Sequence, residues 1–394
     1  MEAGRAASSF LKDSMRRTWI LVLSTTALTG QINDPLSRDL ASAERSELGA
    51  PARLQSDGDA ADMPRLLCRV AVFVQPGIVD ASAAEKLVRY GLTLLTHNNA
   101  QETADAATCL TTLARILESE GQPKEAQREL EHALAIRDRL FGPNHPLVAD
   151  TLNLLGLTNY HQGRMYVAEQ MYGRAVEILR KQASTVDLAA ALSNLGNAMS
   201  AQGKLKEGEE RTREALSIWE RLGGPDDPSV AVGLTNLAVL LQARKQYDQA
   251  ALLLSRALKI DEKKYPPNHP RIGMDLNAAG VLATSRKHYQ EAEDLLSRSI
   301  AILENGPTQP QDPERGQVLL NLGEVYRLEK KMGLAGDALK RGLTAVLMVW
   351  DPTDSRLPSW MDKLALVRRA QEDFAAAEEL EMRATRIRVL HPPL

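Results

Sequence analysis

Apolar and polar residues alternate along most of this chain with the period of an amphipathic α-helix. In the stretch 145–181, Leu155 marks the apolar face of a first predicted helix. Tyr172 and Val176 mark the apolar face of a second one. Between them lies Gly163, which allows the backbone conformation that a short helix–helix connection needs. The stretch therefore predicts a helical hairpin.

The hairpin pattern recurs in seven copies, which are marked by columns of small residues. One small residue lies on each first helix, at intervals of 40 to 43 residues: Ala114, Gly156, Gly196, Ala238, Gly280, Gly323 and Ala365. Two further columns follow on the second helices, as at Ala168 and Ala175. A single hairpin cannot bury its apolar face, so neighbouring hairpins stack and share a core. We interpret the columns as core packing at helix crossings.

The small-residue columns, the leucine before most of the first-column positions and the linkers between copies resemble tetratricopeptide repeats, whose usual period is about 34 residues. The longer period here is similar to the kinesin-light-chain type, in which a Gly-Pro-x-His-Pro linker follows a longer second helix. Matching linkers occupy 142–146 and 267–270, with degenerate forms at 225–228 and 311–313. The resemblance covers about residues 100–390. It implies an all-α fold, a right-handed superhelical solenoid of antiparallel helix hairpins.

The linkers also follow the rules for helix N-termini. His145, Asp227, His269 and Asp312 each precede a proline. Proline suits the first helical position because its missing N–H needs no partner there, and the residue before it lies at the N-cap. An active-site role for these histidines is disfavoured, since no cysteine or carboxylate accompanies them at ligand spacing. We therefore predict structural caps.

The N-terminal segment departs from the repeat pattern. In residues 1–30, Arg16 and Arg17 precede a short apolar run and several small residues, a pattern that indicates a signal or anchor segment. The run is shorter than the ~20 residues of a spanning helix, and Leu28 and Thr29 interrupt the cleavage pattern. A cytoplasmic location and export or anchoring both stay open.

Two further segments precede the repeats. Residues 31–63 are polar, with scattered Ser, Asp, Gly and Pro, and predict a flexible linker. Residues 64–97 match the repeat template weakly and predict a degenerate capping hairpin with helices over 66–74 and 81–95. The seven-repeat domain then occupies residues 98–394.

Composition narrows the class of function. The formal net charge is −3 with both signs interleaved, which argues against a nucleic-acid surface. The only cysteines, Cys68 and Cys109, fall on first helices of adjacent hairpins. Such helices pack ~8–10 Å apart, whereas a disulfide needs Cα atoms about 5.5–6 Å apart. Two buried thiols are therefore predicted, and two cysteines alone do not make a zinc site.

The sequence contains no recognisable catalytic motif. HExxH, GxSxG, CxxC, GxGxxG and the phosphate-binding GxxxxGK[ST] are all missing. Carboxylates along the second helices alternate with Lys and Arg, as on solvated faces. We expect no enzymatic activity, no cofactor, no metal and no small-molecule substrate.

The candidate functional surface is a concave groove lined by the first helices. Positions near the first small-residue column hold an asparagine in five consecutive repeats. The candidate groove residues are Arg115, Asn153, Tyr160, Asn194, Asn197, Asn236, Asn277, Asn321 and Glu324. An amide both donates and accepts, so a ladder of amides can pair with the backbone of an extended peptide. Such asparagines also resemble the cargo-peptide contacts of the kinesin-light-chain type. Alternatively, the amides bond to neighbouring helices and set the pitch of the superhelix.

The resulting prediction is a non-catalytic scaffold that binds a protein or peptide segment in the groove. The alternative is a regulatory or sensor subunit that gates a separately encoded catalytic or DNA-binding partner. The inward positions are mostly Asn, Ser and Thr rather than Lys and Arg, so a clamp for an acidic C-terminal ligand is not expected. Self-association is a further possibility, through Leu380, Ile387 and Leu390 of the last helix.

Overall fold

The computed structural model describes residues 81–181, 186–305, 313–348, 350, 352–354 and 356–390. Every structural statement below concerns these residues. The signal-like segment 1–30, the linker 31–63 and the first predicted helix of the capping hairpin lie outside them.

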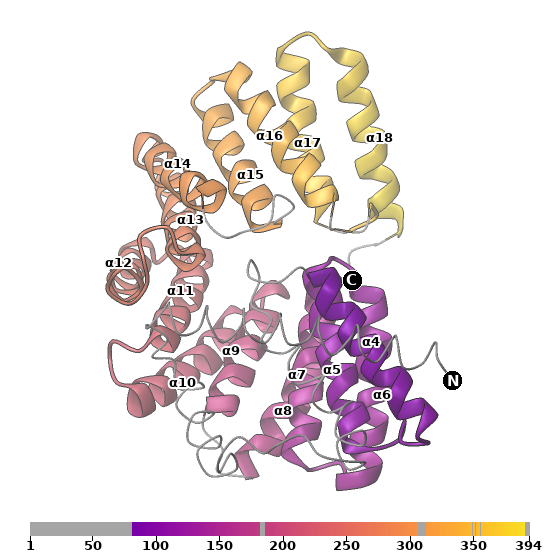
Figure 1. Ribbon diagram of the computed structural model, residues 1–394. Helices are drawn as coiled ribbons and strands as arrows, with labels where there is room; N and C mark the ends of the chain where they lie inside the picture. The colour runs from indigo at the N-terminus through magenta and orange to yellow at the C-terminus, as the bar shows by residue number, and fades with distance from the viewer. Residues whose placement is uncertain are drawn as a thin grey trace. The chain divides into compact units, whose positions relative to one another are not determined.

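The described residues form fifteen α-helices and no strand (Figure 1). After α4 (Ala81–His97) come seven antiparallel pairs: α5 (Ala104–Ser119) with α6 (Pro123–Phe141), α7 (Pro146–His161) with α8 (Met165–Lys181), α9 (Val186–Ala201) with α10 (Leu205–Gly223), α11 (Pro228–Ala243) with α12 (Tyr247–Lys264), α13 (Pro270–Ser285) with α14 (Tyr289–Asn305), α15 (Pro313–Leu328) with α16 (Met332–Leu347), and α17 (Leu357–Ala370) with α18 (Phe374–Leu390). Each pair packs together and contacts the next pair along the chain. The predicted fold class, a right-handed superhelical solenoid of helix hairpins, is confirmed.

The first helices of the hairpins form the inner layer of the stack. From α7 onward, each first helix contacts the first helix of the following hairpin: α7 with α9, α9 with α11, α11 with α13, α13 with α15 and α15 with α17. Consecutive second helices make no comparable contacts in the described part of the chain. Closer spacing of the first helices places them on the inner side of a curved stack, where the groove is expected.

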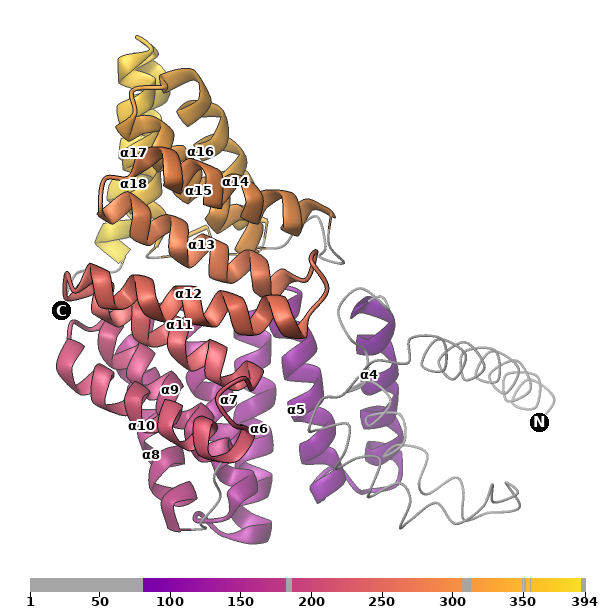
Figure 2. The same cartoon turned by 90° about the vertical axis from the view of Figure 1, so that its left-hand side faces the viewer.

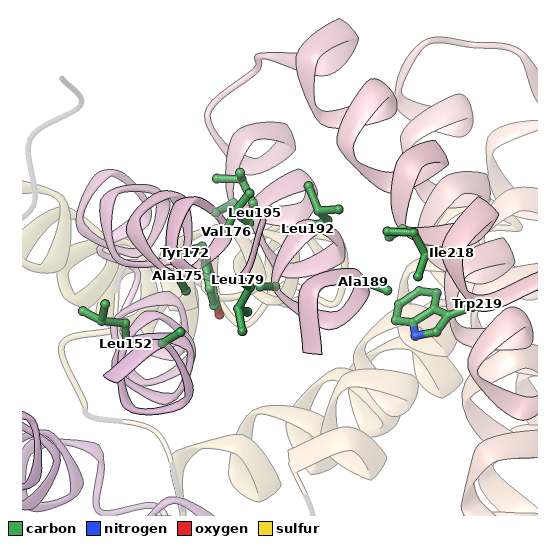
Figure 3. Packing of buried hydrophobic residues seen from close by; sticks show 14 of the residues in the cluster. Leu152, Tyr172, Ala175, Val176, Leu179, Ala189, Leu192, Leu195, Ile218 and Trp219 are labelled. Carbon is green, nitrogen blue, oxygen red and sulfur yellow. The ribbon is translucent and has the colours of Figure 1, made fainter. Parts of the chain in front are cut away.

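The columns of small residues lie at the helix crossings, as predicted. Gly156 leaves so little space that an added Cβ would come within 2.6 Å of the Tyr172 ring. On the second helices, Ala168 and Ala175 are fully buried. Tyr172 and Ala175 lie with Val176 and Leu179 in one cluster that continues through Leu192 and Leu195 of α9 (Figure 3). Larger side chains at the crossings would force these helices apart.

The predicted caps are confirmed in three linkers. The Nδ1 atoms of His145 and His269 each accept the backbone N–H two residues further on, at 3.2 Å. Asp227 Oδ1 accepts the N–H of Ser229 at 2.8 Å. The His269 ring also stacks on Tyr265, with centroids 4.0 Å apart. These histidines thus act as helix caps, while Asp312 lies outside the described residues.

Helix α4 lies beside α5 (Figure 2). It occupies the place predicted for the second helix of the capping hairpin. Its buried residues Ala84, Val88 and Leu95 join the core formed by α5 and α6. The capping hairpin as a whole stays a prediction, since its first helix is outside the described residues.

The expectation of two free thiols is wrong. Cys109 is fully buried and disulfide-bonded. The packing distance of helices is measured between their axes, whereas the disulfide range is a distance between Cα atoms. Because Cα atoms lie about 2.3 Å from a helix axis, facing residues are closer than the axes themselves. Helices ~8–10 Å apart can therefore bring two Cα atoms within disulfide range.

None of the described helices combines the length and the apolar character required to cross a membrane.

Candidate functional site

All nine predicted groove residues lie on first helices, and thus on the inner layer. Arg115 is on α5, Asn153 and Tyr160 on α7, Asn194 and Asn197 on α9, Asn236 on α11, Asn277 on α13, and Asn321 and Glu324 on α15. None is fully buried, and Arg115 is exposed. The repeat pattern therefore brings these side chains to one layer of the molecule.

Most of the asparagines are joined to neighbouring first helices by hydrogen bonds, which we call rungs. Asn194 donates an N–H to Asn153 Oδ1 at 3.0 Å. Asn321 donates to Asn277 Oδ1 at 2.9 Å. Asn236 donates to the hydroxyl of Ser193, a buried residue, also at 2.9 Å. Each rung fixes one first helix against the next, as the structural alternative requires.

The rungs use only part of each amide. A side-chain amide has two N–H donors and an oxygen that accepts two bonds. Asn194 keeps one N–H and its oxygen, and Asn153 keeps both N–H groups, without further partners among the described residues. Asn197 makes no side-chain hydrogen bond to the part of the chain that the structure describes. Structural and binding roles are thus compatible at these positions.

The sequence of amide rungs is interrupted between α11 and α13. Here the hydroxyl of Thr235 donates to Asp275 Oδ1 at 2.9 Å, and no bond joins Asn236 to Asn277. A pocket of about 300 Å³ opens at this point. Its lining residues are Val232, Thr235, Asn236, Arg271, Met274, Asp275, Asn277, Ala278, Leu303, Glu314, Gln317 and Val318. Two predicted groove asparagines therefore border the same pocket.

Asp275 forms a pair of buried carboxyl groups with Asp261 of α12. Both side chains are at most 1% exposed. Arg271 Nε lies 3.4 Å from Asp261 Oδ2. Burial, together with the charge of Asp261, raises the pKa of Asp275 to about 7. Burial also raises the pKa of Asp261, although the Arg271 guanidinium partly offsets this effect. Near neutral pH the pair therefore retains a proton.

Tyr160 lies in a different environment from the asparagines. Burial raises its pKa, and the nearby Arg356 guanidinium partly opposes that rise. Arg356 Nη2 donates to the carbonyl oxygen of His161, the last residue of α7, at 2.9 Å. Asp354 holds the same guanidinium, which lies 3.7 Å from the centroid of the Trp350 ring. Tyr160 thus lies where the end of α7 meets the segment that precedes α17.

The predicted charged groove residues have partners within the chain. Glu324 accepts two hydrogen bonds from Arg327, at 2.7 and 3.0 Å, and lies 3.6 Å from Lys363 Nζ. Arg115 lies 3.6 Å from Asp150 in a largely exposed pair. Such exposed pairs contribute little stability, and a ligand can replace them at low cost.

The apolar residues suggested for self-association are mostly used by their own hairpin. Ile387 is buried, and Leu380 packs against the same core cluster. Only Leu390 of the three is largely exposed. Of the three residues suggested for self-association, two therefore pack inside the molecule.

No group of three or more His, Cys, Asp or Glu side chains suited to a metal ion occurs among the described residues.

Comparison with known proteins identifies the repeats. A family model for the tetratricopeptide repeat matches residues 105–181 and 187–263, which correspond to α5–α8 and α9–α12. These two stretches are tetratricopeptide repeats. Human "Tetratricopeptide repeat protein 19, mitochondrial" is 33% identical over 108 residues, which make up 27% of this chain and 28% of that protein. The chain spans only 12% and 28% of the lengths of the curated relatives that it matches.

Solved structures of other proteins are similar to this chain. Kinesin-light-chain TPR-like repeats from Podosopora anserina align at 24% identity and a TM-score of 0.43, covering 51% of this chain and 96% of theirs. The apo form of the quorum sensor NprR from B. thuringiensis aligns at 12% identity and a TM-score of 0.61, covering 89% of this chain and 94% of that one. The likeness to NprR shows the fold, and the family model confirms the predicted recognition of tetratricopeptide repeats.

Sequence reasoning missed the pocket and its acid pair, although a signal was present. Asp275 lies five residues before Gly280, where the other repeats carry Cys109, Thr151, Ala191, Gly233, Val318 and Trp360. Asp261 lies four residues after Ala257, where most other repeats carry a large apolar residue. Two acidic residues at core positions of neighbouring helices are unusual, because a buried carboxylate needs a partner. Alignment of the repeats would have singled out both.

Proposed function

We propose that this tetratricopeptide-repeat chain is a non-catalytic scaffold that binds an extended segment of a partner protein along its inner face. Repeats of this type support protein interaction in general. The more specific proposal rests on the amides of the first helices. Their unused N–H and C=O groups match the groups that an extended backbone presents, whatever its side chains.

The observation that carries the proposal is the incomplete use of the rung amides. Asn194 and Asn153 retain donors and an acceptor after their mutual bond, and Asn197 retains its whole amide. Neighbouring first helices are ~8–10 Å apart, and an extended chain advances about 3.3 Å per residue. One repeat therefore corresponds to about three residues of ligand. The asparagines from α7 to α15 would then contact about twelve.

The test begins with peptides selected against the full chain from a random display library. Their affinity is then measured for the wild type and for the double variant Asn194→Ala with Asn236→Ala. Loss of two ligand hydrogen bonds should weaken binding by about tenfold or more, since each contributes ~0.5–1.5 kcal/mol. Helical circular dichroism should stay unchanged.

Ser193→Ala is the matched control. It removes the rung from Asn236, but Ser193 is only 2% exposed and makes no contact that a ligand can use. If this variant weakens peptide binding as much as Asn236→Ala does, the asparagine acts only through the rung. Selected peptides that bind the double variant at full strength would contradict the proposal directly.

A second candidate function is a regulatory or sensor subunit, which the contact between Arg356 and the His161 carbonyl favours. This bond joins residues 195 positions apart, so a ligand that changes the curvature of the intervening repeats would break or strengthen it. Amide hydrogen exchange at the end of α7 provides the measurement. A change there when a selected peptide binds at α9 or α11 supports this candidate, and unchanged exchange argues against it.

A further inference from the structure

The pocket between α11 and α15 has the character of a side-chain binding site rather than a flat part of the groove. Its volume of about 300 Å³ lies at the lower end of the range of small-ligand pockets. Its walls include the apolar side chains of Val232, Met274, Leu303 and Val318. Asn236 and Asn277 border it from two neighbouring first helices. A ligand backbone held by these amides could direct one side chain into the pocket.

The pocket carries more negative than positive charge. Asp275 lines it, with Asp261 behind, and Glu314 lines it from α15. Arg271 is the only basic residue in the lining and already lies 3.4 Å from Asp261. His269 adds no charge while its Nδ1 accepts the Arg271 N–H, and burial lowers its pKa. Thr235 of α11 and Leu303 of α14 are uncharged.

Only one oxygen of each acid has a donor, from Thr235 for Asp275 and from Arg271 for Asp261. Asp275 is 1% exposed, and its Oδ2 has no hydrogen-bond partner among the described residues. The same is true of Asp261 Oδ1. A buried carboxylate without a donor is costly, so the site requires either a proton or a cation. In the chain alone, a retained proton meets this requirement.

We propose that the pocket binds a cationic side chain, arginine or lysine, of the partner segment. Its apolar stem packs on Met274 and Val318, while its charged end faces Asp275 and Glu314. Long basic side chains combine these two properties, and hydrogen bonds between ionised groups are stronger than neutral ones. That the cation belongs to a bound partner segment rests on the proposed function. The preference of the pocket for a cation does not.

Binding of the cation is coupled to release of a proton. Because burial raises the pKa of Asp275 to about 7, the free pocket holds a proton near neutral pH. The incoming positive charge favours the ionised pair, so the proton leaves as the ligand enters. Affinity should therefore increase from pH 6 to pH 8.

The probe is Nα-acetyl-arginine amide, with the uncharged Nα-acetyl-citrulline amide of nearly the same shape as its control. The full chain is labelled with ¹³C at the methionine methyl groups, and the signal of Met274 is assigned with Met274→Leu. The arginine amide should shift this signal saturably, with an affinity about tenfold greater than that of the citrulline amide. Equal shifts from both probes, or none at saturating concentration, would overturn the proposal.

Two variants test which acidic residues contribute to the affinity for the arginine amide. Asp275→Asn should lower the affinity for the arginine amide by about tenfold and abolish the pH dependence of that affinity. Glu314→Gln, at the exposed rim, should lower this affinity by a smaller factor. Because Glu314 is exposed, this variant tests the pocket without altering a buried residue. Asp337→Asn removes the same charge from an exposed position on α16 and should change nothing. If Asp337→Asn weakens binding as much as the pocket variants, the attraction is only general electrostatics, and the proposal fails.

The two proposals fail in different ways. In one case, selected peptides need Asn194 for binding, but Asp275→Asn does not weaken the binding of any basic residue in them. The scaffold function then stands, and the pocket assignment is wrong. If the arginine amide binds at Met274 but no peptide depends on the asparagines, the pocket assignment stands and the groove function is wrong.

Discussion

The first three hairpins and the last four form the same turn with different residues. At the position of positive φ, α5/α6, α7/α8 and α9/α10 carry Gly121, Gly163 and Gly203, with φ of 73°, 75° and 79°. The four later hairpins carry Lys245, Lys287, Lys330 and Glu372, with φ between 61° and 64°. Residues with a Cβ are strained in this conformation, whereas glycine is not. The repeat geometry is therefore imposed on the later turns by packing.

The same two regions differ on the inner face. Neutral amide bonds join first helices in both regions, as from Asn194 to Asn153 and from Asn321 to Asn277. In the later region Asp275 and Asp261 occupy core positions and need a proton. Strained turns and a buried acid pair both reduce stability, and both belong to the later region, which also holds the proposed side-chain pocket. The later region thus gives up some stability, and it holds the pocket that we propose for a ligand side chain.

The largest expected effect tests what the two regions share. Ala168→Leu in α8 and Ala292→Leu in α14 each place a large side chain at a fully buried helix crossing. Each should lower the free energy of unfolding by about 1–3 kcal/mol because overpacking pushes the helices apart. Urea unfolding measures the effect, with Gly173→Ala as control, since an added Cβ there meets nothing within 4 Å. If one substitution lowers the free energy of unfolding much less than the other, the helix crossings of the two regions are not equally tightly packed.

The next effect concerns the acid pair. The folded-state pKa of Asp275, about 7, is above its ordinary value of 3.8. Between these values the unfolded chain releases the proton while the folded chain keeps it, so the contribution to stability is full below pH 4 and is lost as pH rises through 7. Asp275→Asn should therefore stabilise the chain by about 1–2 kcal/mol at pH 8.

The advantage of Asp275→Asn over the wild type should decrease as pH falls to 4, because the wild-type side chain is then neutral as well. Asp337→Asn, from the exposed face of α16, should show no such trend. A constant difference between Asp275→Asn and wild type at all pH values would mean that no proton is linked to folding at this pair.

The smallest effect exchanges turn residues between the regions. Lys245→Gly should stabilise α11/α12, because it removes the strain at φ 61°, and the gain should be about 0.5–1 kcal/mol after the greater entropy of unfolded glycine is subtracted. Gly203→Lys should destabilise α9/α10 by a similar amount. Midpoints of urea unfolding provide the comparison. Two changes of the same sign would show that the turns are not equivalent after all.

The sequence predicted those parts of the structure that depend on one hairpin or its immediate linker. Gly156 and Ala168 identified helix crossings because a close approach excludes larger side chains wherever the repeat occurs. His145 and His269 were predicted as caps because the following proline marks the first helical position. The inner-face position of the asparagines followed from their place in the repeat. Whether they bind a partner stays a prediction.

The sequence was less informative where a contact crosses between helices of different hairpins. The distance between the axes of adjacent first helices suggested free thiols, yet Cys109 is disulfide-bonded. Ile387 was predicted to be free for self-association, yet it is buried in a core cluster that α18 shares with α15, α16 and α17. In both cases the orientation of the side chain between packed helices decides the outcome, and periodicity alone does not contain it.

By itself, then, the sequence determined the repeat, its helices, caps and crossings, because these depend on local periodicity and on the size of one residue at a time. Tertiary structure alone decided which amide bonds to which neighbour, since the rungs join residues 41 to 44 positions apart. It also decided that Asp261 and Asp275 share one buried site beside a pocket. Burial changes the charge state of a carboxyl group only when the surrounding helices have excluded water from it.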